Sequence, residues 1–269
     1  MIAAFRSELF LLNRFRMWAV AGVVTIAFTA VATALLVGTV DPTAAADGLS
    51  RPGGGGIPIS ELQGAGGATA AVSWSIYGFG FLLLLTAFTS RIGNDLAKGT
   101  FRSALLQHPN RWSLIAGKMA ALMTVAFGLV VLGLATGALT AGIVAPGQGL
   151  DTGGWFGRDG LTETAIDLAR MMGWAFGWAA IATTLAVTVR SVPLAMGIGV
   201  FWFGPIENII GDELTFATRW FPGLLLQQVG SASPTAAVST GTALATLAAY
   251  GLVAAAIVGV SFKRLDVTS

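Results

Sequence analysis

Arg91 to Lys118 reads RIGNDLAKGTFRSALLQHPNRWSLIAGK and is the longest polar, basic passage of a 269-residue chain that is otherwise almost wholly apolar. One apolar run, Ala68–Thr89, precedes it, and another, Leu114–Val144, begins within its last residues. Each run is long enough to cross a bilayer, because about 20 helical residues span ~30 Å of hydrocarbon. The passage is therefore expected at a membrane surface, between two spans.

The composition predicts an integral membrane protein. Hydrophobic residues make up 55% of the chain and charged residues only 10%, and the mean hydropathy is +0.77. Soluble domains carry about 25% charged residues, so this chain has too few to cover a water-facing surface. Cysteine is absent, which excludes disulfides, thiolate chemistry and sulfur-ligated metals. We expect a single membrane domain.

Six apolar stretches have spanning length, so the expected fold is an all-α polytopic membrane protein. The fifth stretch is the shortest and contains Gly204-Pro205, which predicts a helix that is broken or ends early. The expected spans are Trp18–Val40, Ala68–Thr89, Leu114–Val144, Asp167–Val189, Pro193–Ile210 and Pro234–Phe262.

The N-terminal residues 1–17 are expected to form an amphipathic helix in the membrane interface, because apolar and basic residues alternate at helical spacing from Ile2 to Met17. A cytosolic extension of the first span is the alternative. The apolar run that follows is 23 residues long, longer than the core of a signal peptide, so we interpret it as a retained span. Residues 18–269 then form the six-span domain, with a cytoplasmic loop at residues 90–113.

Three other segments are expected outside the hydrocarbon. Asp41–Gly67 contains four consecutive glycines and is typical of a linker, and Pro146–Glu163 is a second glycine-rich loop. Gly211–Ser233 is predicted to form a short helix and a turn that enters the outer leaflet.

The basic residues predict the orientation, because lysine and arginine in short flanks favour the cytoplasmic side. With the N-terminus inside, eleven of the 15 basic residues lie inside, and both termini are cytoplasmic. The outer side holds only Arg51, Arg158, Arg170 and Arg219. The inner set is Arg6, Arg14, Arg16, Arg91, Lys98, Arg102, Arg111, Lys118, Arg190, Lys263 and Arg264.

Motifs for chemistry are lacking, and we expect no catalytic residue, no metal site and no nucleic-acid partner. The only Gly-Lys pair, Gly117-Lys118, is followed by Met119, so the chain lacks the sequence that cradles nucleotide phosphates. His108 is the single histidine and is interpreted as a loop residue. No carboxylate lies in the middle of a predicted span, which argues against a proton-coupled carrier.

The central passage carries the pattern Asp-x-x-x-Gly-Thr-x-Arg-x-x-Leu-Leu, followed by a proline and an arginine, and it resembles the cytoplasmic loop of ABC type-2 permeases. The family more often has Glu in place of Asp95 and a basic pair in place of Asn110-Arg111. The resemblance implies a coupling helix over Asp95–Leu106 that docks on an ATPase subunit. The implied docking residues are Asp95, Lys98, Gly99, Thr100, Arg102, Leu105, Leu106, Pro109 and Arg111.

The resemblance also implies a function: the permease subunit of an ATP-driven exporter in the cytoplasmic membrane. ATP and magnesium would be bound by a separate ABC ATPase subunit, and a second permease copy or paralogue and membrane lipid would be the other partners. The scarcity of charge suits hydrophobic or amphipathic cargo such as a drug, a peptide antibiotic or a lipid. The alternatives are a secondary transporter or channel and a non-transporting membrane anchor.

Several residues within the spans are candidates for a translocation path: Thr25, Thr29, Thr33 and Glu207. For the threonine stripe Thr25, Thr29 and Thr33, the alternative is back-bonding to their own helix. Glu207 is a candidate to line an exit gate, and the alternatives are a snorkelling or a loop-capping role. Two Gly-x-x-x-Gly pairs, beginning at Gly133 and Gly173, predict close helix packing. Asp167 and Arg170 are expected to pair on one helix face. An apolar path is a further hypothesis for Phe79, Phe81, Trp174, Phe176 and Trp178.

Overall fold

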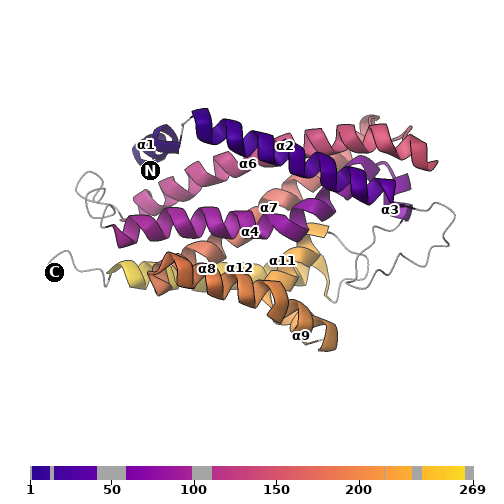
Figure 1. Ribbon diagram of the computed structural model, residues 1–269. Helices are drawn as coiled ribbons and strands as arrows, with labels where there is room; N and C mark the ends of the chain where they lie inside the picture. The colour runs from indigo at the N-terminus through magenta and orange to yellow at the C-terminus, as the bar shows by residue number, and fades with distance from the viewer. Residues whose placement is uncertain are drawn as a thin grey trace. The chain divides into compact units, whose positions relative to one another are not determined.

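The computed structural model describes residues 2–12, 15–40, 59–98, 111–214, 216–231 and 238–263, and the regular structure in these ranges is entirely helical. Figure 1 shows the helices in chain order from indigo to yellow. They are α1 (Ile2–Leu12), α2 (Phe15–Gly38), α3 (Ile59–Gln63), α4 (Gly67–Ala97), α6 (Arg111–Val144), η1 (Ala145–Gln148), α7 (Arg158–Val189), α8 (Val192–Phe201), η2 (Trp202–Ile206), α9 (Glu207–Glu213), α10 (Ala217–Trp220), α11 (Pro222–Ser231) and α12 (Thr240–Lys263).

Within the described residues, five helical segments are long and apolar enough to cross a membrane. The two halves of α4, Gly67–Gly78 and Gly80–Ala97, meet at a bend of 49° and make a sixth when they count as one span. The chain is therefore an all-α multi-pass membrane protein, as the composition predicts. The five segments are Ala19–Gly38, Trp112–Gln148, Arg158–Val189, Val192–Gly211 and Thr240–Ser261.

Two predicted span starts lie about two turns from the observed helix starts. The fourth span begins at Arg158 rather than Asp167, because the mostly polar residues 158–163, which are expected in a loop, form the first turns of α7. That loop is reduced to the 3₁₀ turn η1 and a short connection. The last span begins at Thr240 rather than Pro234, and residues 232–237 lie outside the described part of the chain.

The fifth span is continuous, which corrects the expected break at Pro205. Proline has no backbone N–H, and the helix widens around Pro205 into the π-helical turn η2 before it continues as α9. The side-chain amide of Asn208 donates to the carbonyl oxygen of Gly204 at 2.5 Å.

The described helices pack into two units. The first unit comprises Met1–Asn13, Phe81–Ala126 and Gly173–Ser269, and the second comprises Arg14–Gly80 and Phe127–Met172. Helices α4, α6 and α7 contribute residues to both. Each unit has its own hydrophobic core.

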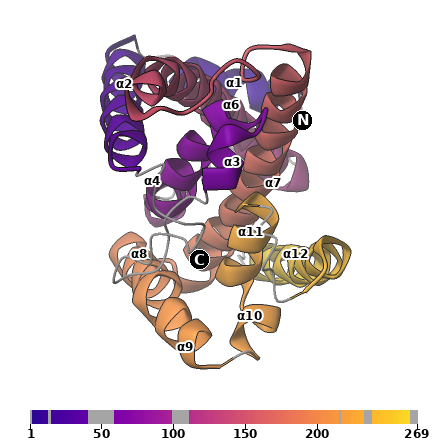
Figure 2. The same ribbon diagram turned by 90° about the vertical axis from the view of Figure 1, so that its right-hand side faces the viewer.

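In the first unit, the core includes Leu85 and Phe88 of α4, Leu114 and Leu122 of α6, and Ala182 of α7. The apolar face of α1 packs against this core. Figure 2 shows α11 beside α12, and α9 leading to the short helix α10. The segment after α9 thus contains two helices, where the sequence predicts one helix and a turn.

In the second unit, Trp155 organises the connection between η1 and α7. Its indole N–H donates to the carbonyl oxygen of Leu62 at 3.0 Å, and its side chain is almost fully buried. Gly67 and Gly160 allow this arrangement, because a Cβ on Gly67 would lie 2.5 Å from the indole nitrogen and one on Gly160 would lie 2.0 Å from the backbone oxygen of Trp155.

Candidate functional site

A cluster of four charged side chains in the first unit joins α1, α4 and α6. Lys118 donates to Asp95 at 2.7 Å and also to Glu8, while Arg91 donates to Glu8 at 2.7 Å. The side chains of Lys118 and Glu8 are only 6% and 7% exposed, and Asp95 is 15% exposed. We call Glu8, Arg91, Asp95 and Lys118 the ion cluster.

The local sequence brings these charges together in a simple way. Arg91 and Asp95 are four residues apart and share one face of α4 near its end. Lys118 lies two turns into α6. On α1, Phe5 and Leu9 pack against the same core, and Glu8 is on their side of the helix. Two cations thus meet two carboxylates.

Burial makes the ion cluster a strong geometric constraint. Removing a charge from water is costly, and in this case each buried charge has an opposite partner that offsets the cost. Removal of one partner would leave the other charge uncompensated. The cluster therefore holds α1 against the ends of α4 and α6, on both sides of residues 99–110.

The structure corrects where the expected coupling helix begins, while residues 99–106 lie outside the described part of the chain. Asp95 and Leu96 do not begin a new short helix but lie in the last turns of α4, which ends at Ala97. No helix breaker interrupts the chain before Gly99, and Leu96 packs against the core. The connection between α4 and α6 is accordingly shorter than the predicted loop of residues 90–113.

The docking residues are only partly described. Lys98 is exposed in a turn after α4. Arg111 opens α6. His108 and the following predicted docking residues lie outside the described residues: Gly99, Thr100, Arg102, Leu105, Leu106 and Pro109. Their docking role stays a prediction.

Glu8 is the member of the ion cluster that sequence reasoning missed. Its signal was present: Glu8 follows Phe5 by three residues and precedes Leu12 by four, so the carboxylate lies on the apolar face of the N-terminal helix. Lys118 likewise follows Leu114 by four residues. A charge on an apolar helix face predicts an opposite charge on the facing element.

Glu207 is fully buried in the first unit and caps a helix. Its carboxylate accepts the indole N–H of Trp202 at 3.0 Å and the backbone N–H of Leu224 at 3.2 Å. Leu224 is in the first turn of α11, where backbone N–H groups lack helical partners and the helix dipole favours a negative charge. These two bonds are what a capping role predicts; the translocation-path role of Glu207 stays a prediction.

The threonine stripe of α2 packs against α6 within the second unit. Thr29 donates to the carbonyl oxygen of Thr25 at 2.7 Å, which confirms back-bonding for this residue. A Cβ on Gly133 would lie 3.3 Å from the Thr29 methyl group, and one on Gly137 would lie 3.2 Å from the Thr33 hydroxyl. The first Gly-x-x-x-Gly pair thus makes a close helix contact, as predicted.

In the second glycine pair, Gly173 and Gly177 differ in how closely a neighbouring helix approaches them. A Cβ on Gly177 would lie 2.3 Å from a methyl group of Leu226, which indicates close packing of α7 against α11. Gly173 has no atom within 4 Å of that position. Only Gly177 therefore makes the predicted contact within the first unit.

Two of the aromatic residues proposed for an apolar translocation path are buried within the first unit. Trp174 and Trp178 are 1% and 2% exposed, and the Trp178 ring lies 5.1 Å from those of Phe81 and Phe203. Phe176, in contrast, is 59% exposed. The side chain of Phe79 lies outside the described residues.

Asp167 centres a smaller polar cluster in the second unit. Arg170 donates to it at 3.1 Å, which confirms the predicted pair, and the Thr69 hydroxyl donates to it at 2.5 Å. Burial, and then the nearby Asp167 carboxylate, raise the pKa of Glu61 in α3 above its usual value of 4.5.

Neither cluster is placed to hold a metal ion. The described residues contain no group of three histidine, aspartate or glutamate side chains placed to hold a metal ion. Comparison of the chain with protein-family models, with curated proteins and with solved structures gave no match.

Proposed function

We propose that the chain is the permease subunit of an ATP-driven exporter of the ABC type-2 class, lying in the cytoplasmic membrane with both termini in the cytoplasm. Three features support the proposal: the multi-pass helical fold, the excess of basic residues on one side, and the resemblance of residues 95–118 to the family's cytoplasmic loop.

The observation that carries the proposal is the position of the ion cluster around residues 99–110. Because Asp95 and Lys118 are bonded to each other, α4 is joined near its end to α6 two turns after its start, on either side of this segment. A force applied to the segment would act on both helices together and, through Glu8, on α1. A coupling element needs this kind of connection between the docking surface and the spans.

In this proposal the energy comes from a separate ABC ATPase subunit, which binds ATP and magnesium. A second permease copy or paralogue completes the transporter, and cargo crosses between the two permeases. The few charges of the spans favour hydrophobic or amphipathic cargo, such as a drug, a peptide antibiotic or a lipid.

Co-purification and reconstitution test this function. The tagged chain, solubilised gently from its native membrane, should bring down an ATP-binding subunit, and vesicles that contain both should move an amphipathic dye only when ATP is hydrolysed. Transport driven by an ion gradient alone would favour a secondary transporter. An assembly that neither binds an ATPase nor moves cargo would favour a membrane anchor.

The docking surface needs a variant that leaves the fold intact. Asp95→Ala is unsuitable, because it would also break the Asp95–Lys118 pair. Arg102→Ala should instead lower the amount of bound ATPase without a change in thermal stability, with Arg102→Lys as the charge-preserving control. Undiminished ATPase binding and transport in Arg102→Ala would contradict the role of this residue.

A further inference from the structure

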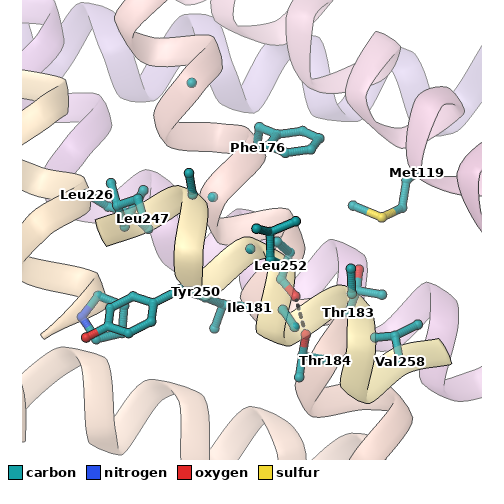
Figure 3. A pocket seen from close by; sticks show the side chains of 18 of the residues that line it. Met119, Phe176, Ile181, Thr183, Thr184, Leu226, Leu247, Tyr250, Leu252 and Val258 are labelled. Atoms are coloured by element: carbon teal, nitrogen blue, oxygen red, sulfur yellow. Dashed lines mark hydrogen bonds between the residues drawn. The ribbon is translucent and has the colours of Figure 1, made fainter. Parts of the chain in front are cut away.

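The first unit contains an apolar pocket of about 520 Å³, bounded by residues of α6, α7, α11 and α12. Figure 3 shows Leu226, Leu247 and Tyr250 at one end and Met119, Thr183 and Val258 at the other. Its edge is open, since Phe176 and Leu252 are 59% and 74% exposed. This volume lies within the ~300–1,000 Å³ range of ligand pockets.

The polar groups of the lining are already used within the protein. Thr183 donates to the carbonyl oxygen of Ala179 at 2.7 Å, Thr184 donates to that of Ala180 at 2.8 Å, and the Tyr250 hydroxyl donates to that of Trp220 at 2.7 Å. A ligand would find few groups to hydrogen-bond, so a saturated hydrocarbon chain suits this lining better than a polar molecule.

The pocket is elongated along the spans. Its lining residues on α12 run from Leu244 to Val258, fourteen residues apart, which corresponds to a rise of about 21 Å at 1.5 Å per residue. One leaflet of a ~30 Å hydrocarbon layer is about 15 Å deep. The pocket is therefore long enough to follow a lipid chain through the depth of a leaflet.

Glycine creates part of this space. Gly173 on α7 and Gly251 on α12 line the pocket, and a Cβ at either position would meet no atom within 4 Å. The open volume therefore reaches the helix backbones. A Cβ atom at either of these two positions would enter the pocket without meeting a neighbour.

One end of the pocket lies where two helix ends carry basic residues in the sequence. α6 begins at Arg111 and α12 ends at Lys263. These two helix ends are neighbours, because a Cβ on Gly259 would lie 2.5 Å from the ring of Trp112, which itself lines the pocket. Clustered basic residues at the end of a span attract anionic lipid headgroups.

We propose that this pocket holds an acyl chain of an anionic phospholipid, from the leaflet at which α6 begins and α12 ends. The hydrocarbon lies against α7 and α12, and the headgroup phosphate is next to the basic residues at these helix ends. The proposal does not depend on ATP-driven transport.

Photo-crosslinking of the full chain in nanodiscs tests the proposal. The probe is phosphatidylglycerol with a diazirine on its acyl chain, and labelled peptides are located by mass spectrometry. Labelling should concentrate on α7 and α12. Gly251→Leu should lower it about tenfold, the change that ~1.4 kcal/mol of lost binding produces.

The matched control is Gly128→Leu on α6, an exposed position outside the pocket whose Cβ would also meet open space. It should leave labelling unchanged. Thermal unfolding reports whether each variant folds. If Gly251→Leu is unstable, Gly173→Leu on α7 is the alternative variant that fills the same pocket. Undiminished labelling in a folded filled-pocket variant would overturn the proposal.

Two further outcomes would also contradict the proposal. Equal labelling by phosphatidylcholine with the same diazirine chain would show that the pocket does not select an anionic headgroup. Cross-links between α12 residues of two copies, together with loss of dimers in Gly251→Leu, would show that a second chain covers the pocket. This result would contradict the proposal that a lipid chain occupies it. No readout involves the ATPase, so these results are separable from the proposed function.

Discussion

Lys118 and Asp95 form an ion pair at 2.7 Å across a sequence separation of 23 residues, and Lys118 also contacts Glu8. One buried ammonium thus serves carboxylates from two different helices. This bond joins α4 near its end to α6 two turns after its start, on either side of the segment 99–110 for which we propose docking to an ATPase. In that proposal, stability and coupling depend on the same side chain.

Lys118→Met should destabilise the protein by about 3–5 kcal/mol, because Glu8 and Asp95 would then lie buried and close together with only Arg91 to offset them. Thermal unfolding of the detergent-solubilised protein measures the loss. Combining Lys118→Met with Glu8→Gln removes one charge of each sign. The double variant should therefore be more stable than Lys118→Met alone, and strict additivity of the two changes would contradict direct pairing.

Glu207→Ala should cost about 1–3 kcal/mol, since it leaves the backbone N–H of Leu224 and the indole N–H of Trp202 without their carboxylate acceptor. Thermal unfolding checks the cost, and tryptophan fluorescence checks the loss of the indole bond. Transport per folded molecule should stay unchanged if the residue acts as a cap. Selective loss of transport at full stability would instead support the gate hypothesis.

Gly137→Ala and Gly128→Ala compare two glycines of α6. A Cβ on Gly137 would lie 2.3 and 3.0 Å from the two methyl groups of Val72, so a change of Val72 rotamer cannot relieve the contact. We expect Gly137→Ala to cost about 1–3 kcal/mol through overpacking. Gly128→Ala enters open space and should be neutral or stabilising by up to about 1 kcal/mol. Equal unfolding temperatures for the two variants would refute the close contact of α4 and α6 in the second unit.

Glu61→Gln should raise the unfolding temperature at neutral pH. The pKa of Glu61 is raised in the folded state above 4.5, so the folded protein binds a proton more readily than the unfolded chain. Its charged form therefore lowers stability as the pH rises through the folded pKa, and this penalty is absent well below 4.5. The unfolding temperatures of Glu61→Gln and of the unsubstituted protein should therefore differ at neutral pH and converge at about pH 3. Glu163→Gln, in the second turn of α7, serves as a control with no expected gain. A gain at both pH values would point to a cause other than the carboxyl charge.

Much of the fold could be predicted because spanning helices are a local property. Residues 19–38 and 112–148 are helical and apolar over the necessary length whatever surrounds them, since hydrocarbon requires backbone hydrogen bonds within each segment. Local spacing also predicts the Asp167–Arg170 pair, because residues three apart share a helix face.

The sequence by itself determined the membrane class, the spans, and the polar passage between the second and third of them. Only the tertiary structure decided what its charges do. Glu8 and Lys118 are 110 residues apart, and Glu207 and Leu224 are 17 apart, so no helical periodicity relates them. Their pairing follows from packing of different helices, because a buried charge must find its partner in space and not along the chain.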